Sequence, residues 1–337
     1  MSLQIINSPI FRHSDLKLIG KQIVIKKTPF YYVNKLKKLP SFLKEFRTKK
    51  YSKIDHDQKL FFQGSKNIYY KRSQIISKII LRKFKEKKIK ILDYGCNNGS
   101  LLKELNKLNF INLFGYDINS NYKKFFNKSK IRYLNKIKSY QNEFDLIIFS
   151  HSIAYTQNIK KLIKLIKKIL KKKGHILINL QNISKRPLNF LYGDQKYHFN
   201  KKMVKNYFGK IGKLQFIKER SLNHELIFII RLGKNKNRSK KISYKEISKI
   251  KRMITNIKKI NSNCFVYGEN ILGALCNKLI NKKIIAIVST KSKNKKFFGK
   301  RIVDLKNFQL KKSPLICLND RNNLLAKKTY ISKLIKV

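Results

Sequence analysis

Between Ile89 and Leu180, short apolar runs alternate with stretches of helical periodicity, and this alternation restricts the fold more than any other feature of the sequence. The apolar runs include ILDYG (91–95), LFGYD (113–117) and FDLIIFS (144–150), and amphipathic segments separate them. Strands that alternate with helices form a parallel sheet that helices cover on both faces. The pattern therefore predicts an α/β fold with a mostly parallel sheet.

The turn ILDYGCNNGS (91–100) is the sharpest local feature. Gly95 and Gly99 let a ligand approach the backbone, and the helix that follows offers free N–H groups. Asp117 ends the next apolar run, 22 residues after Gly95, close to the spacing of about 20 residues typical of a carboxylate that binds ribose hydroxyls. Because the glycines are spaced G-x-x-x-G, the turn favours a ligand with ribose and adenine over a dinucleotide.

Together with FDLIIFSHSIAYTQN (144–158) and KKKGHILINL (171–180), this turn resembles the successive motifs of class I S-adenosylmethionine-dependent methyltransferases. The resemblance implies a Rossmann-like fold over about residues 76–232, methyltransferase activity and S-adenosyl-L-methionine as the cofactor. It further implies that Asp93 and the two glycines line the methionine end, that Asp117 holds the ribose, and that the residues after the 144–150 run face the methyl group. The cofactor-binding residues expected on this basis are Asp93, Gly95, Cys96, Asn97, Gly99, Asp117, Ser150 and His151.

Three further segments resemble those of sugar C-methyltransferases, namely GDQKYHFN (193–200), SLNHELIFIIR (221–231) and VYGENILGAL (266–275). This resemblance implies that the acceptor is a nucleotide-linked sugar, methylated at carbon during glycan or polysaccharide biosynthesis. It also implies several domains in a fixed order. The expected division is an irregular leader domain at 1–75, a methyltransferase domain at 76–232, a linker with a helix at 233–262 and a small Rossmann-like α/β domain at 263–337.

A carbon acceptor has to lose a proton before it is methylated, which requires a base and a donor to the oxyanion that forms. Histidine suits the first task and tyrosine the second. The predicted catalytic residues are His224, His198, Tyr197 and Tyr70, from segments expected near the carboxyl ends of the strands. A structural role stays open for each of them. Tyr197 and His198 can form a packed pair, His224 can point outward, and Tyr70 can serve packing alone.

Cysteine usage bears on metal binding. The leader domain of the sugar C-methyltransferases usually binds zinc through four cysteines, but the first cysteine of this sequence is Cys96. Before it only His13 and His56 are available as Cys or His ligands, whereas a structural zinc site needs four. We therefore predict no bound metal. The four cysteines form no C-x-x-C pair, which predicts reduced thiols.

The net charge of the chain suggests a second class of acceptor. The 80 Lys+Arg outweigh the 17 Asp+Glu, and the formal charge of +63 favours a nucleic-acid partner. The lysines are, however, scattered with isoleucine and asparagine, as an AT-rich genome also produces. SHSIAY (150–155) stands where adenine-methylating enzymes typically carry an Asp/Asn-Pro-Pro-aromatic run. We predict a small-molecule acceptor and no specific nucleic acid. The alternatives are an RNA or DNA methyltransferase and a methyltransferase-like scaffold without turnover.

Targeting signals are not evident in the sequence. It has no run of about 18 apolar residues, and its opening segment lacks the cationic and apolar regions of a signal peptide. We therefore predict a cytoplasmic protein without membrane insertion. The sequence leaves the oligomeric state and the identity of the acceptor open.

Overall fold

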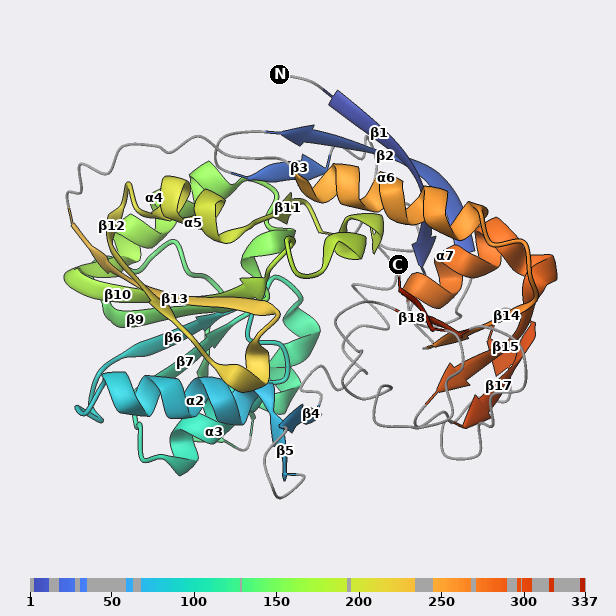
Figure 1. Ribbon diagram of the computed structural model, residues 1–337. Coiled ribbons are helices and arrows are strands. Elements are labelled where there is room, and N and C mark those ends of the chain that lie inside the picture. The colour runs from blue at the N-terminus through green and yellow to red at the C-terminus, as the bar shows by residue number, and fades with distance from the viewer. Residues whose placement is uncertain are drawn as a thin grey trace.

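The fold is given by a computed structural model (Figure 1). The structure describes residues 3–11, 18–27, 31–34, 59–62, 68–127, 129–192, 195–233, 245–267, 271–289, 296–297, 299–304, 315–317 and 334–336. His13 and His56 lie outside the described residues. Within the described part of the chain, no helix is both long and apolar enough to cross a membrane.

The largest element of the fold is a seven-stranded sheet. Its strands are β6 (Ile91–Tyr94), β7 (Leu113–Tyr116), β8 (Arg132–Tyr133), β9 (Phe144–Ser150), β10 (Leu170–Gln181), β12 (Gly212–Ile217) and β13 (Glu225–Leu232). Their spatial order is β12-β13-β10-β9-β6-β7-β8. The strands from β10 to β8 are parallel, and β13 pairs antiparallel with both of its neighbours. The predicted α/β fold with a mostly parallel sheet is confirmed.

Helices cover both faces of this sheet. They are α2 (Arg72–Lys83), α3 (Ser100–Lys107), α4 (Ile159–Ile169) and α5 (Lys201–Phe208). In Figure 1, α2 and α3 lie on one face and α4 and α5 on the other. Successive strand residues point to opposite faces, so Ile147 joins the core beneath α4 and α5 while Ile148 joins the core beneath α2 and α3. Burial on both faces explains why β9 reads as a continuous apolar run in the sequence.

The helix α4 begins where the sequence predicts it but ends earlier. The Asn158 side chain accepts a hydrogen bond from the Lys161 N–H at 3.0 Å and caps the first turn. The sequence predicts a helix to about Lys172, whereas Leu170 already pairs with Phe144 of β9. The lysine-rich stretch that continues the helical pattern is therefore the start of β10.

Two shorter elements also differ from the sequence-based expectation. In place of the helix that the sequence predicts from Asn121, the described residues form the 3₁₀ helix η3 (Ser120–Phe125). The Asn119 side chain accepts a hydrogen bond from the Asn121 N–H at 3.2 Å, which tightens the chain just after β7. The edge strand β12 has no counterpart in the prediction, because its sequence GKLQFI is only partly buried and carries a weak periodic signal.

The leader forms strands, in the residues that the structure describes, rather than the irregular structure predicted for it. β1 (Leu3–Phe11) and β2 (Leu18–Lys27) pair antiparallel, and β3 (Tyr32–Asn34) and β11 (Tyr197–His198) extend them to a four-stranded sheet. Pro9 interrupts the apolar pattern in the sequence, but β1 is an edge strand, where the missing N–H of proline is tolerated. A second pair, β4 (Lys59–Phe62) and β5 (Ile68–Lys71), leads into α2.

The C-terminal part of the chain forms a separate six-stranded sheet. Its elements are α6 (Lys245–Lys258), β14 (Cys264–Tyr267), α7 (Ile271–Ile280), η7 (Asn281–Lys283), β15 (Ile284–Ser289), β16 (Lys296–Phe297), β17 (Lys300–Asp304), β18 (Leu315–Cys317) and β19 (Leu334–Lys336). The order is β16-β17-β15-β14-β18-β19, with all pairs parallel except β16–β17. In Figure 1 the leader strands run along α6 between the two large sheets.

Glu246 in α6 connects the leader with two loops beside the seven-stranded sheet. Its buried carboxylate accepts hydrogen bonds from Tyr32 Oη at 2.6 Å and Asn200 Nδ2 at 3.0 Å, and also from the Ser184 hydroxyl. Burial opposes ionisation of Glu246, but these three donors together hold its pKa below the ordinary value. One carboxylate thus fixes side chains from three distant parts of the sequence.

We expect Glu246→Ala to destabilise the protein by about 1.5–3 kcal/mol near neutral pH, because three donors lose an ionised acceptor. A pKa depressed in the folded state contributes stability above the pKa of the unfolded state, and this contribution is lost as the pH falls through the folded value. The loss caused by the variant should therefore shrink below about pH 4. Urea unfolding at neutral and acidic pH measures both effects.

The matched control is Glu143→Ala. Glu143 pairs with Lys90 at a partly exposed position, where an ion pair contributes about 0–1 kcal/mol. Equal losses of stability in Glu143→Ala and Glu246→Ala would contradict the role assigned to Glu246.

Candidate cofactor and acceptor site

The turn after β6 requires glycine at two positions. Gly95 has φ +85° and Gly99 has φ +75°, both in the left-handed region that favours glycine. A Cβ at Gly95 would lie 2.4 Å from the Ser152 Cβ, and one at Gly99 would lie 2.8 Å from the Phe126 ring. Ser152 in turn donates its hydroxyl to the Tyr94 carbonyl at 2.6 Å. The close packing of Ser152 and Phe126 therefore requires glycine at both positions, whether or not a ligand also approaches them.

Asp117 follows β7 and connects two neighbouring strand ends. Its carboxylate accepts backbone hydrogen bonds from Asn97 at 3.1 Å and from Asn119 at 2.9 Å. Burial raises the pKa of Asp117, although the two backbone hydrogen bonds oppose that shift. The carboxylate is thus held rigidly beside the turn after β6, as a residue that binds two ribose hydroxyls has to be.

Asp93 is buried at the end of β6, and its Oδ1 has no hydrogen-bond partner among the described residues. Burial, and then the nearby charge of Asp117, raises the pKa of Asp93 to about 7. The Asn97 Oδ1 is also buried without a partner in the described structure. These unpaired acceptors, with the Asp117 carboxylate, match the ammonium group and ribose hydroxyls of S-adenosyl-L-methionine. The residues present therefore fit this cofactor.

Two further residues complete the cofactor side. Burial, followed by the charges of Asp93 and Asp117, raises the pKa of Cys96 well above its ordinary value, so this cysteine is a packed thiol rather than a nucleophile. Ile118, to which the sequence analysis gave no role, is 91% exposed directly after Asp117.

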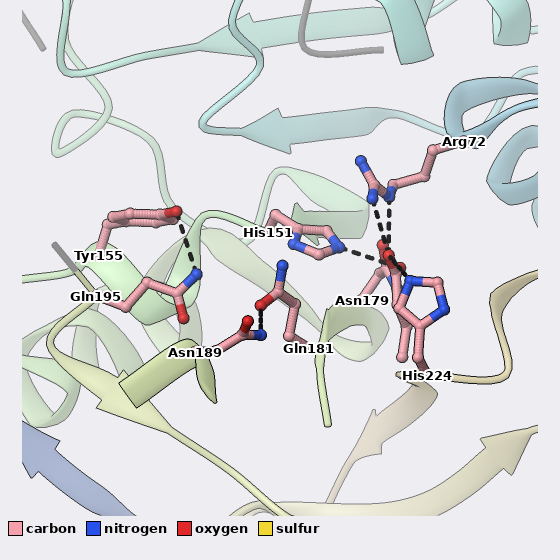
Figure 2. A network of polar contacts seen from close by, with 9 residues as sticks. Arg72, His151, Tyr155, Asn179, Gln181, Asn189, Gln195 and His224 are labelled. Carbon is pink, nitrogen blue, oxygen red and sulfur yellow. Dashed lines mark hydrogen bonds and ion pairs between the residues drawn. The ribbon is translucent and has the colours of Figure 1, made fainter. Parts of the chain in front are cut away.

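Residues at the ends of β9, β10 and β13 meet at the buried carboxylate of Glu225, and Figure 2 shows Arg72, His151 and His224 gathered there. Glu225 lies 2.8 Å from Arg72 Nη2, 3.0 Å from His151 Nε2 and 3.6 Å from His224 Nε2, and it accepts a hydrogen bond from Asn179 Nδ2 at 2.7 Å. Burial opposes its ionisation, but His151 and Arg72 hold its pKa well below the ordinary value. The structure thus brings together two histidines that the sequence analysis placed in separate roles.

Glu225 itself has no predicted role in the sequence analysis. The signal for it is a charged residue that opens the apolar strand ELIFII in a chain with 17 acidic residues. His224 is held in a less basic state than an ordinary histidine. Burial, and then the charge of Arg186, lowers the pKa of His224 to about 4, although Glu225 opposes the shift.

Tyr197 and His198 lie in β11 as a packed pair. The Tyr197 hydroxyl donates to the Gln157 carbonyl at 3.4 Å and accepts from the Ile159 N–H at 3.4 Å. The His198 ring lies 4.7 Å from that of Phe190, and burial lowers the pKa of His198 to about 3. A histidine with so low a pKa is a weak base near pH 7, so the geometry favours the structural alternative for His198 over the predicted catalytic role.

A small cavity of about 10 Å³ adjoins this pair and holds roughly one water molecule. Hydrogen bonds run beside it from Gln195 Nε2 to Tyr155 Oη at 3.2 Å and from Asn189 to Gln181. The lining contains amides, imidazoles and apolar groups but no Lys, Arg, Asp or Glu. The lining residues are His151, Ala154, Leu180, Gln181, Ile183, Asn189, Gln195, Tyr197, His198 and Phe199.

The leader reaches this side of the site through Tyr31 and Tyr32. Tyr32 pairs with His198 across β3 and β11, and the Tyr31 ring lies 5.0 Å from that of Tyr197. The sequence analysis expected Tyr70 to make the leader's contribution. The Tyr70 ring instead lies 4.6 Å from Lys78 Nζ, in a groove between α2 and α3. The structure therefore does not bring Tyr70 to the predicted histidines.

Metal binding receives no support from the described residues, in which no group of three or more His, Cys, Asp or Glu side chains is arranged to hold a metal ion. The two histidines of the leader, His13 and His56, lie outside these residues, so the prediction of no bound metal stays a prediction.

Comparisons with known proteins define the class. Residues 68–226, just under half of the chain, match the family model described as a methyltransferase domain. The matched region begins with β5, includes the turn after β6 and Asp117, and ends just after Glu225. The chain is an S-adenosylmethionine-dependent methyltransferase, and S-adenosyl-L-methionine is its cofactor.

Solved structures of methyltransferases show similarity to about half of the chain. A SAM-dependent methyltransferase from Archaeoglobus fulgidus shares 19% identity, with 57% of this chain and 99% of that chain covered and a TM-score of 0.39. A protein assigned as a type 11 methyltransferase from Sulfolobus solfataricus shares 21% identity, with 48% and 95% covered and a TM-score of 0.39. At these scores the similarity adds no argument about the acceptor. A search of curated proteins finds no match.

We expect Asp117→Ala to weaken the binding of S-adenosyl-L-methionine by about 1.5–3 kcal/mol, because the ribose hydroxyls lose a charged acceptor. Isothermal titration calorimetry with the wild type and the variant measures the difference. Unchanged affinity in Asp117→Ala would reject the assignment of the ribose site.

The raised pKa of Asp93 predicts a pH dependence of cofactor binding. Near pH 6 the carboxyl of the free protein is protonated, and near pH 8 it is ionised and attracts the cofactor's ammonium group. The affinity for S-adenosyl-L-methionine should therefore rise with pH across this range, with release of a proton on binding. Calorimetry in buffers of different ionisation enthalpy counts that proton.

Asp93→Asn should remove both the pH dependence and the proton release. Asp145→Asn is the control, since Asp145 pairs with Lys171 at the other end of β9. A wild-type affinity that stays constant between about pH 6 and pH 8 would contradict the role of Asp93.

Proposed function

We propose that the protein transfers a methyl group to carbon of a small-molecule acceptor, a nucleotide-linked sugar, in glycan or polysaccharide biosynthesis in the cytoplasm. The observation that carries this proposal is the polar cluster around Glu225 beside the turn after β6. A carbon acceptor has to be deprotonated, and this cluster supplies imidazoles and a buried counter-charge where the strands end. The resemblance of segments 193–200, 221–231 and 266–275 to sugar C-methyltransferases supports the same acceptor class.

The residues around the water-sized cavity also favour an acceptor that carries hydroxyl groups beside it. The chain carries a formal charge of +63, yet the cavity beside His151 is lined without Lys, Arg, Asp or Glu. Neutral amides such as Gln181 and Gln195 donate and accept hydrogen bonds, and so match hydroxyl groups, which also do both.

A nucleic-acid acceptor is the second candidate, and the charge of the chain is the observation that favours it. The outer face of α4 carries lysines, among them Lys160, Lys161 and Lys164. Binding through such lysines releases counterions and falls steeply with salt concentration, and it carries no sequence information. We therefore expect weak binding of RNA and DNA at low salt only.

The test is methyl transfer from isotope-labelled S-adenosyl-L-methionine to a panel of nucleotide sugars. We expect the label in at least one sugar, with NMR showing a methyl group on carbon rather than on oxygen. Asp117→Ala, weakened in cofactor binding, controls for contaminating activity and should lose most of the product. Transfer to an RNA or a DNA duplex that persists at physiological salt and discriminates against random sequence would instead establish the second candidate.

A further inference from the structure

His151 has a backbone conformation that residues with side chains rarely adopt. Its φ is +58°, in the left-handed region, directly after β9. Its N–H donates to the Asn179 carbonyl at 2.8 Å, and the next residue, Ser152, donates its hydroxyl to Tyr94 at 2.6 Å. Strained positions of this kind persist where the surrounding structure fixes them and are common at functional sites. His151 is thereby tied to the turn after β6 on one side and lines the small cavity on the other.

The carboxylate of Glu225 lies beside the imidazole of His151. The Glu225 side chain is fully buried, and its Oε2 lies 3.0 Å from His151 Nε2 while its Oε1 lies 2.8 Å from Arg72 Nη2. Arg72 compensates the buried charge, because a carboxylate this deep is stable only when it is paired. In Figure 2, Arg72 and His224 lie on one side of His151, and Gln181, Asn189 and Gln195 lie on the other.

We propose that His151 is the base of the methyl-transfer reaction and that Glu225 is its positioning residue, with Glu225 accepting the Nε2–H of His151 and Nδ1 taking the proton of the acceptor. The proposal rests on the proposed small-molecule acceptor, which has to lie between the turn after β6 and the cavity. It assigns to His151 a step in the reaction rather than contact with the cofactor alone.

The proton transfer breaks one C–H bond and forms one N–H bond. The C–H bond of the acceptor breaks, its proton passes to His151 Nδ1, and its electron pair stays on carbon for the new bond to the methyl group. When bound, the cofactor supplies that methyl group on a sulfonium, which leaves as a neutral thioether. The positive charge is then on the imidazolium of His151, 3.0 Å from the ionised carboxylate of Glu225.

The other histidines of the site are less suited to this step. His198 packs against Phe190 and keeps a pKa of about 3, so it holds a proton poorly. His224 lies further from Glu225 than His151 does, at 3.6 Å, and its pKa is about 4. Among these three histidines, only His151 both lines the cavity and lies in close contact with the buried carboxylate.

A first experiment needs no acceptor. Long-range ¹H–¹⁵N spectra of the labelled protein report which ring nitrogen of each histidine carries the proton, and the spectrum of His151→Gln assigns the His151 signals by their loss. We expect the Nε2–H tautomer for His151 in the wild type above neutral pH. An Nδ1–H tautomer would overturn the proposal.

The double variant Arg72→Met, Glu225→Leu tests the orienting role of Glu225. It removes both buried charges together and so avoids leaving one of them unpaired, which a single substitution would do. His151 should lose its preference for the Nε2–H tautomer in this variant. A folded double variant that retains the preference would overturn the role of Glu225.

A second experiment measures methyl transfer to the nucleotide-sugar panel. His151→Gln should lower kcat by about 10²–10⁴-fold while the affinity for S-adenosyl-L-methionine changes little. The control is His175→Gln, because His175 packs on Phe84 near the opposite end of the β9–β10 pairing and should keep full activity. Full kcat in His151→Gln, on a sugar that the wild type methylates, would overturn the proposal. If the wild type methylates no sugar, the proposed acceptor is wrong. The tautomer measurement alone then decides whether Glu225 accepts the Nε2–H of His151.

Discussion

The ion pair between Glu225 and Arg72 is the interaction on which the polar cluster at the ends of β9 and β10 depends. It joins the first residue of β13 to the first residue of α2, which are 153 positions apart in the chain. The same carboxylate reaches Asn179 in β10 and His151 after β9. Four separate elements therefore meet at one buried charge. Removing only one member of such a pair leaves the other uncompensated, which typically costs about 3–5 kcal/mol.

A second buried carboxylate plays a comparable part for the leader. Glu246, at the start of α6, binds Tyr32 of β3 and Asn200 before α5. Tyr31 and Tyr32 then cover the segment that contains Tyr197 and His198. The leader thus packs against Tyr197 and His198, which line the small cavity.

The parts of the fold that the sequence predicts are those with a local signal. The turn after β6 is recognisable because Gly95, Gly99 and Asp117 are close in sequence and fixed by strand ends, and the parallel sheet follows from the alternation of elements. The edge strand β1 was missed because Pro9 reads as an interruption, although an edge position tolerates it. The domain boundaries at 75, 232 and 262 stay predictions.

The acceptor side could not be predicted to the same degree, for a physical reason. The pairing of Arg72 with Glu225, and of Tyr32 with His198, depends on contacts between residues far apart in the chain, which leave no periodic pattern. The histidines were recognisable as chemically suitable, but whether each is a base depends on its burial. For His198 the enclosed ring favours the structural alternative, and no property of the sequence around it reports that enclosure.

The placement of β3 has a consequence for synthesis on the ribosome. Tyr32 emerges early, yet the carboxylate that binds its hydroxyl belongs to Glu246, 214 positions later. At about 5–20 residues per second, translation needs roughly 10–40 s to supply that partner. Early in this interval β11, the partner of β3, has not been synthesised either. The nascent leader therefore presents an unpaired sheet edge of the kind that pairs with other chains. This edge is covered only once β11 has been synthesised and pairs with β3.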